Sequence, residues 1–137
     1  MIVASFDIDP VAKGRARFTR QGRAYTPAKT RSFESTLRSL AHDRMTIPLP
    51  AGPLRVEVTY FFAPTKSGKN CFPIVKPDLD NLIKSLDAFN GIFWVDDKQI
   101  VEIEARKHYD WNRRVGSIHI VVSEIPVFKI PKKGSSK

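Results

Sequence analysis

The sequence predicts a single α+β domain with a mixed, mostly antiparallel sheet and two main helices. Two observations predict this class. Stretches in which apolar and polar residues alternate, as in half-buried strands, are interleaved with two stretches whose apolar residues recur every three or four positions, as in helices. The 137 residues suit one domain, because domains most often have about 100–150 residues. We expect the domain to span residues 1–128 and a basic, disordered tail to occupy residues 129–137.

A strand and a β-hairpin are the first predicted elements. Residues 2–8 are short and rich in apolar side chains, which indicates a strand, and Asp9-Pro10 is a turn signal that ends it. Residues 17–19 and 24–26 flank a polar stretch in which Gly22 suits a turn. We therefore expect a hairpin with a strongly basic exposed face.

The first helix is expected to run from Thr26 to about Met45. Thr26 suits the N-cap, and Pro27 suits the first helical position, where its missing N–H is not needed. Residues 54–62 alternate between apolar and polar and predict the strand that follows. The helix has apolar residues at helical spacing that predict one core-facing stripe: Phe33, Leu37, Leu40, Ala41 and Met45.

A second amphipathic helix is expected over residues 78–89, with Asn90-Gly91 as a left-handed C-terminal cap. Three charged residues on its polar face, Asp80, Lys84 and Asp87, are spaced i, i+4 and i+7. On an α-helix this spacing places them on one side. The core-facing stripe would consist of Leu79, Leu82, Ile83, Leu86 and Phe89.

Three further strands are predicted in the remainder of the chain. They cover residues 92–95, 99–108 and 115–123, and a turn near residues 110–112 joins the last two. Phe93 and Trp94 lie in the first of these strands, and we expect them in the core or in a subunit interface.

The charge of the chain favours nucleic acid as its partner. Twenty-three Lys and Arg residues against 14 Asp and Glu residues give a net charge of +9, which attracts polyanions. The alternative is a basic surface that only keeps the protein soluble. Residues 13–31 contain no acid and carry seven cations: Lys13, Arg15, Arg17, Arg20, Arg23, Lys29 and Arg31.

Cysteine content and hydropathy restrict the cellular setting. Cys71 is the single cysteine, so neither an intramolecular disulfide nor a cysteine-based zinc site can form within the chain. No apolar run reaches the ~18 residues of a membrane span, and the first residues do not resemble a signal peptide. We expect a cytoplasmic protein without a membrane partner.

Acidic residues in two places predict metal chemistry. Asp78 and Asp80 flank Leu79, and Asp96-Asp97 follow the second helix. Carboxylates from several elements are what Mg²⁺ prefers, and a nuclease uses such a metal to activate water and neutralise phosphate charge. In the alternative interpretation Asp78 is an N-cap, Asp80 favours the helix dipole, and Asp96-Asp97 form a turn. The spacing alone leaves both open.

Lys84 has two interpretations as well. It lies four residues after Asp80, so a surface ion pair on the helix would account for it. Beside a metal cluster, the same ammonium would stabilise the attacking hydroxide or the negative charge that builds on the phosphate.

The acidic block has a specific order. Residues 76–84 read Lys-Pro-Asp-Leu-Asp-Asn-Leu-Ile-Lys, and Asp87, Asn90-Gly91 and residues 96–100, Asp-Asp-Lys-Gln-Ile, follow. With the basic residues 13–18 and the stretch from Tyr25 to Thr30, this pattern resembles the RusA family of Holliday-junction resolvases. The resemblance spans residues 2–107 and implies a RusA-like fold.

The resemblance also implies roles for individual residues. Asp78, Asp80 and Asp97 would be the catalytic acids that bind Mg²⁺, with Mn²⁺ as a possible substitute, and Lys84 would assist near the phosphate. Asp96 and Asp87 match acidic positions whose role stays open. The charge of the chain points to DNA contacts by seven cations: Lys13, Arg15, Arg17, Arg20, Arg23, Lys29 and Lys76.

By resemblance, the expected function is Mg²⁺-dependent resolution of four-way DNA junctions by a homodimer that makes symmetric paired nicks in recombination and repair. A two-fold junction suits a two-fold enzyme with paired sites. Two alternatives stay open. One is a basic DNA-binding module without catalysis, and the other is a nuclease that acts on other branched DNA.

Overall fold

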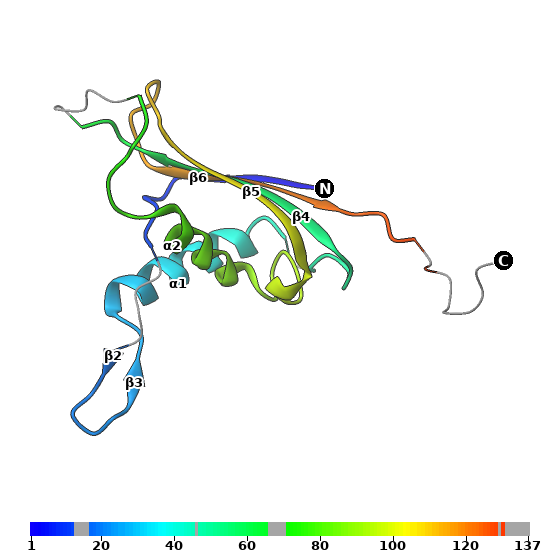
Figure 1. The fold of residues 1–137 in the computed structure, drawn as a ribbon, viewed down its shortest axis with the longest axis horizontal. Helices are drawn as coiled ribbons and strands as arrows, with labels where there is room; N and C mark the ends of the chain where they lie inside the picture. Colours follow the sequence, from blue (N-terminus) through cyan, green and yellow to red (C-terminus); the bar gives the residue numbers. More distant parts are fainter. Residues whose placement is uncertain (13–16, 46, 66–70, 129, 131–137) are drawn as a thin grey trace.

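The computed structural model describes residues 1–12, 17–45, 47–65, 71–128 and 130. Within them the predicted α+β architecture is confirmed: one layer is a four-stranded sheet, and both helices cover one of its faces (Figure 1). Across the sheet the strands stand in the order β1-β6-β4-β5. Their bounds are Ile2–Phe6 for β1, Leu54–Phe62 for β4, Ile100–Tyr109 for β5 and Ser117–Glu124 for β6.

The sheet is mixed and mostly antiparallel, as predicted. β6 runs antiparallel to both β1 and β4, whereas β4 and β5 run parallel. In register, Val58 of β4 lies between Ile120 of β6 and Ala105 of β5. A parallel pair requires a crossover connection. The chain between β4 and β5 is this crossover, and it carries the acidic residues singled out above.

The core lies between the sheet and the helices. Every second residue is buried from Leu54 to Tyr60 of β4 and from Ile118 to Val122 of β6, because alternate side chains on a strand point to the same face. Stacked aromatic rings extend the core, and the rings of Phe89 and Phe93 lie 4.8 Å apart. Fully buried residues from the sheet and the helices meet there: Val56, Val58, Tyr60, Ile120, Val122, Leu37 and Leu82.

The first helix, α1 (Ala28–His42), is shorter than predicted at both ends. Pro27, expected as the first helical residue, is the N-cap, because its ψ of 144° is extended. At the other end the amides of Arg44 and Met45 both bond to the carbonyl of Ala41, which closes the helix before Met45. The predicted N-cap at Thr26 and the predicted end at Met45 are therefore wrong.

A β-hairpin formed by β2 (Arg17–Phe18) and β3 (Ala24–Tyr25) projects from the body of the protein (Figure 1). Arg17 pairs with Tyr25, and Gly22 has a φ of +81°, the left-handed conformation that glycine adopts without strain. The predicted hairpin, with Gly22 in its turn, is confirmed.

The second predicted helix is split into two elements. An α-helical turn, α2 (Leu79–Ile83), continues as a 3₁₀ helix, η1 (Lys84–Phe89). The Ser85 hydroxyl donates to the carbonyl of Leu82 at 2.6 Å and so competes with the regular backbone bonds. A 3₁₀ helix has three residues per turn, which brings Leu86 and Phe89 onto the same buried face.

This change removes the basis of the alignment expected for Asp80, Lys84 and Asp87. That alignment assumed one continuous α-helix, whereas Asp80 belongs to α2 and the other two residues belong to η1. The cap after the helix is confirmed at Gly91, whose φ is +79°. Asn90 itself is the C-cap of η1 and keeps a negative φ.

The predicted strand at residues 92–95 is wrong. The chain turns there, because the amides of Ile92 and Phe93 both bond to the carbonyl of Phe89. Ile92, Phe93 and Trp94 are buried in succession, which the alternating faces of a strand do not allow. Phe93 and Trp94 belong to the core, one of their two expected places. A short 3₁₀ turn, η2 (Asp97–Gln99), then leads into β5.

In the described part of the chain no helix combines the length and the apolar character that a membrane span needs.

Candidate functional site

Asp78 and Asp80 stand at the start of α2, at the entry to the helical part of the crossover. Asp78 is the N-cap, with extended backbone, but its carboxylate makes no capping hydrogen bond. Asp80 lies in the first turn, and both side chains are exposed. The capping interpretation of Asp78 therefore has no hydrogen bond to support it, and both carboxylates face solvent where a ligand can approach.

Asp96, in contrast, has a structural task. It is the N-cap of η2, where its carboxylate accepts the N–H of Lys98 at 3.0 Å. The Gln99 side chain completes a capping box by accepting the N–H of Asp96 at 3.1 Å. The Gln99 amide group also donates to two carbonyls of the loop before β4, those of Pro50 and Gly52. The turn that carries Asp97 is thus held in place by its neighbours.

Asp97, Asp96 and Asp87 influence one another electrostatically. Partial desolvation raises the pKa of the Asp97 carboxyl, although the residue is exposed, and the adjacent Asp96 and the Asp87 of η1 raise it further. The pKa of Asp96 is lowered, first by the Lys98 amide and then by a hydrogen bond with Asp97. Carboxylates that repel each other in this way favour a bound cation. The structure therefore brings both acids of uncertain role, Asp87 and Asp96, close to Asp97.

Lys84 stands at the junction of α2 and η1. Its ammonium donates to the Asn81 side-chain oxygen at 3.3 Å, and the side chain is exposed. Among the ion pairs found between described residues, none joins Lys84 to Asp80. The surface ion-pair interpretation of Lys84 is therefore not supported, and its charge stays available to a ligand.

No ready-made metal centre is present in the part of the chain that the structure describes. Nowhere there do three or more His, Cys, Asp or Glu side chains come together closely enough to hold an ion. The donor set is nevertheless of one chemical kind, because every candidate ligand is a carboxylate, the ligand of hard cations such as Mg²⁺.

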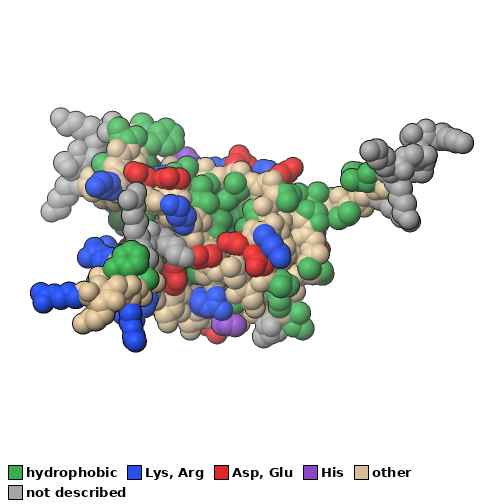
Figure 2. All heavy atoms as spheres, turned by 60° about the horizontal axis from the view of Figure 1, so that its bottom comes forward, with side chains coloured by type: hydrophobic (Ala, Val, Ile, Leu, Met, Phe, Trp, Pro, Cys, Tyr) green, Lys and Arg blue, Asp and Glu red, His purple; other side chains and the backbone are tan. Residues whose placement is uncertain are grey.

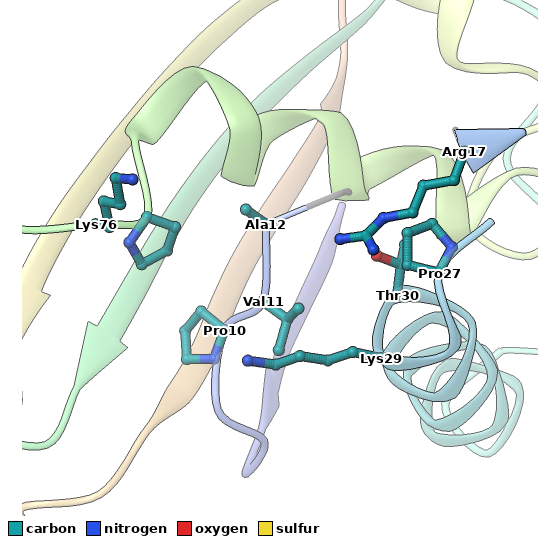
Figure 3. Close-up of a pocket in the computed structure, with 9 residues that line it drawn as sticks. Pro10, Val11, Ala12, Arg17, Pro27, Lys29, Thr30 and Lys76 are labelled. Atoms are coloured by element: carbon teal, nitrogen blue, oxygen red, sulfur yellow. The ribbon is translucent and has the colours of Figure 1, made fainter. Parts of the chain in front are cut away.

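A basic pocket of about 550 Å³ adjoins the acidic segment (Figure 3). Arg17 from β2, Lys29 from α1 and Lys76 from the segment before α2 reach it from three sides. Its other lining residues are uncharged: Pro10, Val11, Ala12, Pro27, Thr30 and Pro77.

The remaining predicted DNA contacts lie partly elsewhere. Arg20 and Arg23 are exposed on the projecting hairpin, whereas Lys13 and Arg15 lie outside the described residues. On the face that carries the helices, acidic side chains gather in the middle and Lys and Arg side chains lie around them (Figure 2). This arrangement suits a polyanion that is bound by the surrounding Lys and Arg side chains and reacts at the acids in the middle.

Sequence reasoning missed Lys107, which lines a second hollow of about 540 Å³ together with Lys76 and Asp78. Lys107 lies on β5, where its ammonium donates to the carbonyls of Val75 and Pro77, each at 2.7 Å. A signal was present in the sequence. Lys107 stands at a helix-facing position of the alternating strand, opposite the buried Tyr60, where an apolar residue is expected.

Arg38 of α1 was missed as well. Its guanidinium donates to the carbonyl of Ala88 at 2.7 Å and to that of Asn90 at 3.0 Å, and so ties α1 to the end of η1. Its sequence neighbourhood, a polar position on an amphipathic helix, gave no indication of this partner.

Comparison with known proteins identifies the family of this chain. A sequence model described as Endodeoxyribonuclease RusA matches residues 7–120. An uncharacterized protein, YqaN of Bacillus subtilis (strain 168), is 30% identical over 123 residues, which cover 78% of this chain and 87% of that protein. The crossover junction endodeoxyribonuclease rusA of Lactococcus phage r1t is 38% identical over 77 residues, 53% of this chain and 56% of that protein. The chain therefore belongs to the RusA family of endodeoxyribonucleases, enzymes that hydrolyse DNA.

Proposed function

We propose that this nuclease resolves four-way DNA junctions by symmetric paired nicks in a Mg²⁺-dependent reaction. Asp78, Asp80 and Asp97 bind the metal, and Lys84 assists at the phosphate. The observation that supports this most is the place of Asp97, which the capping box of η2 holds close to two further carboxylates, those of Asp96 and Asp87. Carboxylates that lie this close together are typical of sites that bind a cation or a proton.

The carboxylates fit the metal by their chemistry and do not need to converge as a complete cage. Mg²⁺ is usually held by one or two carboxylates, and waters and substrate phosphate oxygens complete its shell. When bound, it lowers the pKa of a water molecule and neutralises charge on the scissile phosphate. A site with few protein ligands is consistent with the dispersed acids at α2 and η2.

The side chains of this chain have separate tasks in the proposal. Lys84 places a positive charge beside α2, where it stabilises the negative charge that develops on the phosphate as the bond breaks. Asp96 caps η2 and so fixes the backbone of Asp97. The basic pocket holds the DNA backbone next to the acids through three cations, Arg17, Lys29 and Lys76.

Paired nicks require two active sites, so we propose that the enzyme acts as a homodimer. A four-way junction has two-fold symmetry, and a dimer with the same symmetry presents one site to each of the two strands that are cut. Sizing the protein in solution, alone and with a junction, tests this part separately. A monomer that stays a monomer on the junction contradicts it.

The decisive experiment measures cleavage of a synthetic four-way junction by the wild type, by Asp80→Asn and by the control Asp43→Asn. Asp43 is an exposed carboxylate just beyond α1, so its replacement makes the same chemical change away from the site. We expect Mg²⁺-dependent cutting by the wild type and the control, and a loss of at least about a thousandfold in Asp80→Asn with junction binding retained. Metal-dependent cutting by Asp80→Asn at the wild-type rate refutes the assignment.

A panel of substrates decides between junctions and other branched DNA. Cleavage of flaps, forks, RNA–DNA hybrids and linear duplexes of the same sequence is measured in parallel with cleavage of the junction, with Mg²⁺ and with Mn²⁺. Preference for the four-way junction, with nicks at symmetric positions, is the expected result. Faster cutting of a flap or a hybrid would support metal-dependent hydrolysis but contradict the four-way junction as the preferred substrate.

A further inference from the structure

The segment that leads into the acidic motif lies outside the helices and strands. Residues 71–78 lead into α2: the amide of Ile74 donates to the carbonyl of Phe72, residues 75–77 bend, and Asp78 is extended. Such a stretch does not fix its own geometry, because regular backbone bonding is what holds a chain rigid. Its position relative to the sheet must come from contacts with other elements.

Lys107 supplies this contact from β5, the strand at the edge of the sheet. Its ammonium donates to the carbonyls of Val75 and Pro77, each at 2.7 Å. Hydrogen bonds from a charged donor at this distance are short and strong. The two carbonyls lie on either side of Lys76, and Pro77 directly precedes Asp78. One side chain therefore holds both ends of the turn from which a proposed DNA contact and a proposed metal ligand project.

The backbone of Lys107 is held by the strand pairing, whereas its flexible side chain can place the ammonium against a partner. β5 is paired with β4 without interruption from Glu102 to Tyr109, and Lys107 is in register with the fully buried Tyr60. The half-buried ammonium also lies 5.9 Å from the centre of the Phe62 ring, a favourable place for a cation. An ammonium has three donors, and the two carbonyls take two of them.

We propose that Lys107 is a positioning residue for the nuclease site: it fixes the turn at residues 75–77 and thereby the place of Asp78 relative to Asp97. The proposal rests on the proposed function for the role of Asp78. Lys107 acts through the backbone it binds and does not itself take part in the reaction. Displacement of a catalytic group by about 1 Å can reduce a rate about a hundredfold.

The test compares Lys107→Met with Arg106→Met, a matched control. Arg106 is the adjacent residue of β5, and it points to the other face of the sheet, where it pairs with Glu104 and Thr59. Both variants lose one positive charge and keep an unbranched side chain. Hydrogen exchange of the metal-free proteins is expected to be about tenfold faster in Lys107→Met at the amides of Val75, Lys76 and Asp78. The control is expected to show no change there.

Single-turnover cleavage gives the second readout. We expect Lys107→Met to cut a four-way junction about ten- to a hundredfold more slowly at saturating protein, with junction affinity within about threefold of the wild type. Lys107→Arg, which keeps a charged double donor, is expected to restore part of the rate. If urea denaturation shows that Lys107→Met does not fold, Lys107→Gln carries both readouts in its place.

Two results overturn the proposal. One is wild-type exchange at residues 75, 76 and 78 in the Lys107 variant, and the other is an equal loss of rate in Arg106→Met. If the wild type itself does not cut four-way junctions, the proposed function fails. The exchange measurement on metal-free protein still decides whether Lys107 holds the turn.

Discussion

Replacing Arg38 by Met tests how firmly α1 holds the site. The guanidinium of Arg38 donates to the carbonyls of Ala88 and Asn90, at 2.7 and 3.0 Å, where η1 ends. A hydrogen bond from a charged donor contributes about 1.5–3 kcal/mol. The two bonds share one nitrogen, and water replaces part of the loss because the contact is only partly buried. We therefore expect Arg38→Met to lower the free energy of unfolding by about 2–4 kcal/mol.

Urea denaturation measures this change, and Arg31→Met is the control. Arg31 lies two turns earlier on the same helix and is exposed, so the same substitution there is expected to change stability by no more than about 0.5 kcal/mol. The slope of the transition should stay the same, because the amount of surface exposed on unfolding does not change. An Arg38→Met variant as stable as the control refutes the reasoning that the two carbonyl bonds stabilise the fold.

Three further predictions concern the site and its surroundings. Asn is as good an N-cap as Asp, so Asp96→Asn should keep the fold and most of the cleavage rate, whereas Asp96→Ala should lower the stability. Denaturation and cleavage assays check this, and complete loss of cleavage in Asp96→Asn would mean that the charge itself is needed. The pKa of Asp110 is lowered, first by the Arg113 amide, so its stabilising effect is present above the ordinary pKa near 4 and is lost as the pH falls through the lowered value. Unfolding midpoints of wild type and Asp110→Asn should therefore differ at pH 7 and converge in acid, and a difference independent of pH would contradict this. Arg17→Gln should reduce by about one the slope of log junction affinity against log salt concentration, and an unchanged slope would show that Arg17 does not contact phosphate.

The sequence was most informative where the physical cause of structure is local. The alternation over residues 54–62 depends only on one buried face, and it predicted β4 with its bounds. Gly22 was predicted in a hairpin turn and Gly91 in a left-handed helix cap, and both have a positive φ, which few other residues adopt without strain. The family pattern in the crossover was equally readable, because its residues are close together in the chain.

Prediction failed where distant residues decide the outcome. At the change from α2 to η1, the Leu82 carbonyl accepts the hydroxyl of Tyr60, 22 positions earlier in the chain, in addition to the hydroxyl of Ser85. The contacts of Lys107 and Arg38 join residues about 30 and 50 positions apart, which no local pattern contains. The roles assigned to Asp78, Asp80, Asp97 and Lys84 stay predictions until the variants are measured.

The parallel pairing of β4 with β5 also bears on how the chain folds. The two strands cannot align until residues 63–99 have crossed the sheet, so a long loop is closed before the pairing returns any free energy. Until then one edge of β4 is unpaired and open to strands of other chains. The crossover that carries the acidic residues thus determines when β5 pairs with β4. Contacts that order it, such as those of Lys107 and Arg38, would shorten the time during which a newly made chain is prone to aggregate.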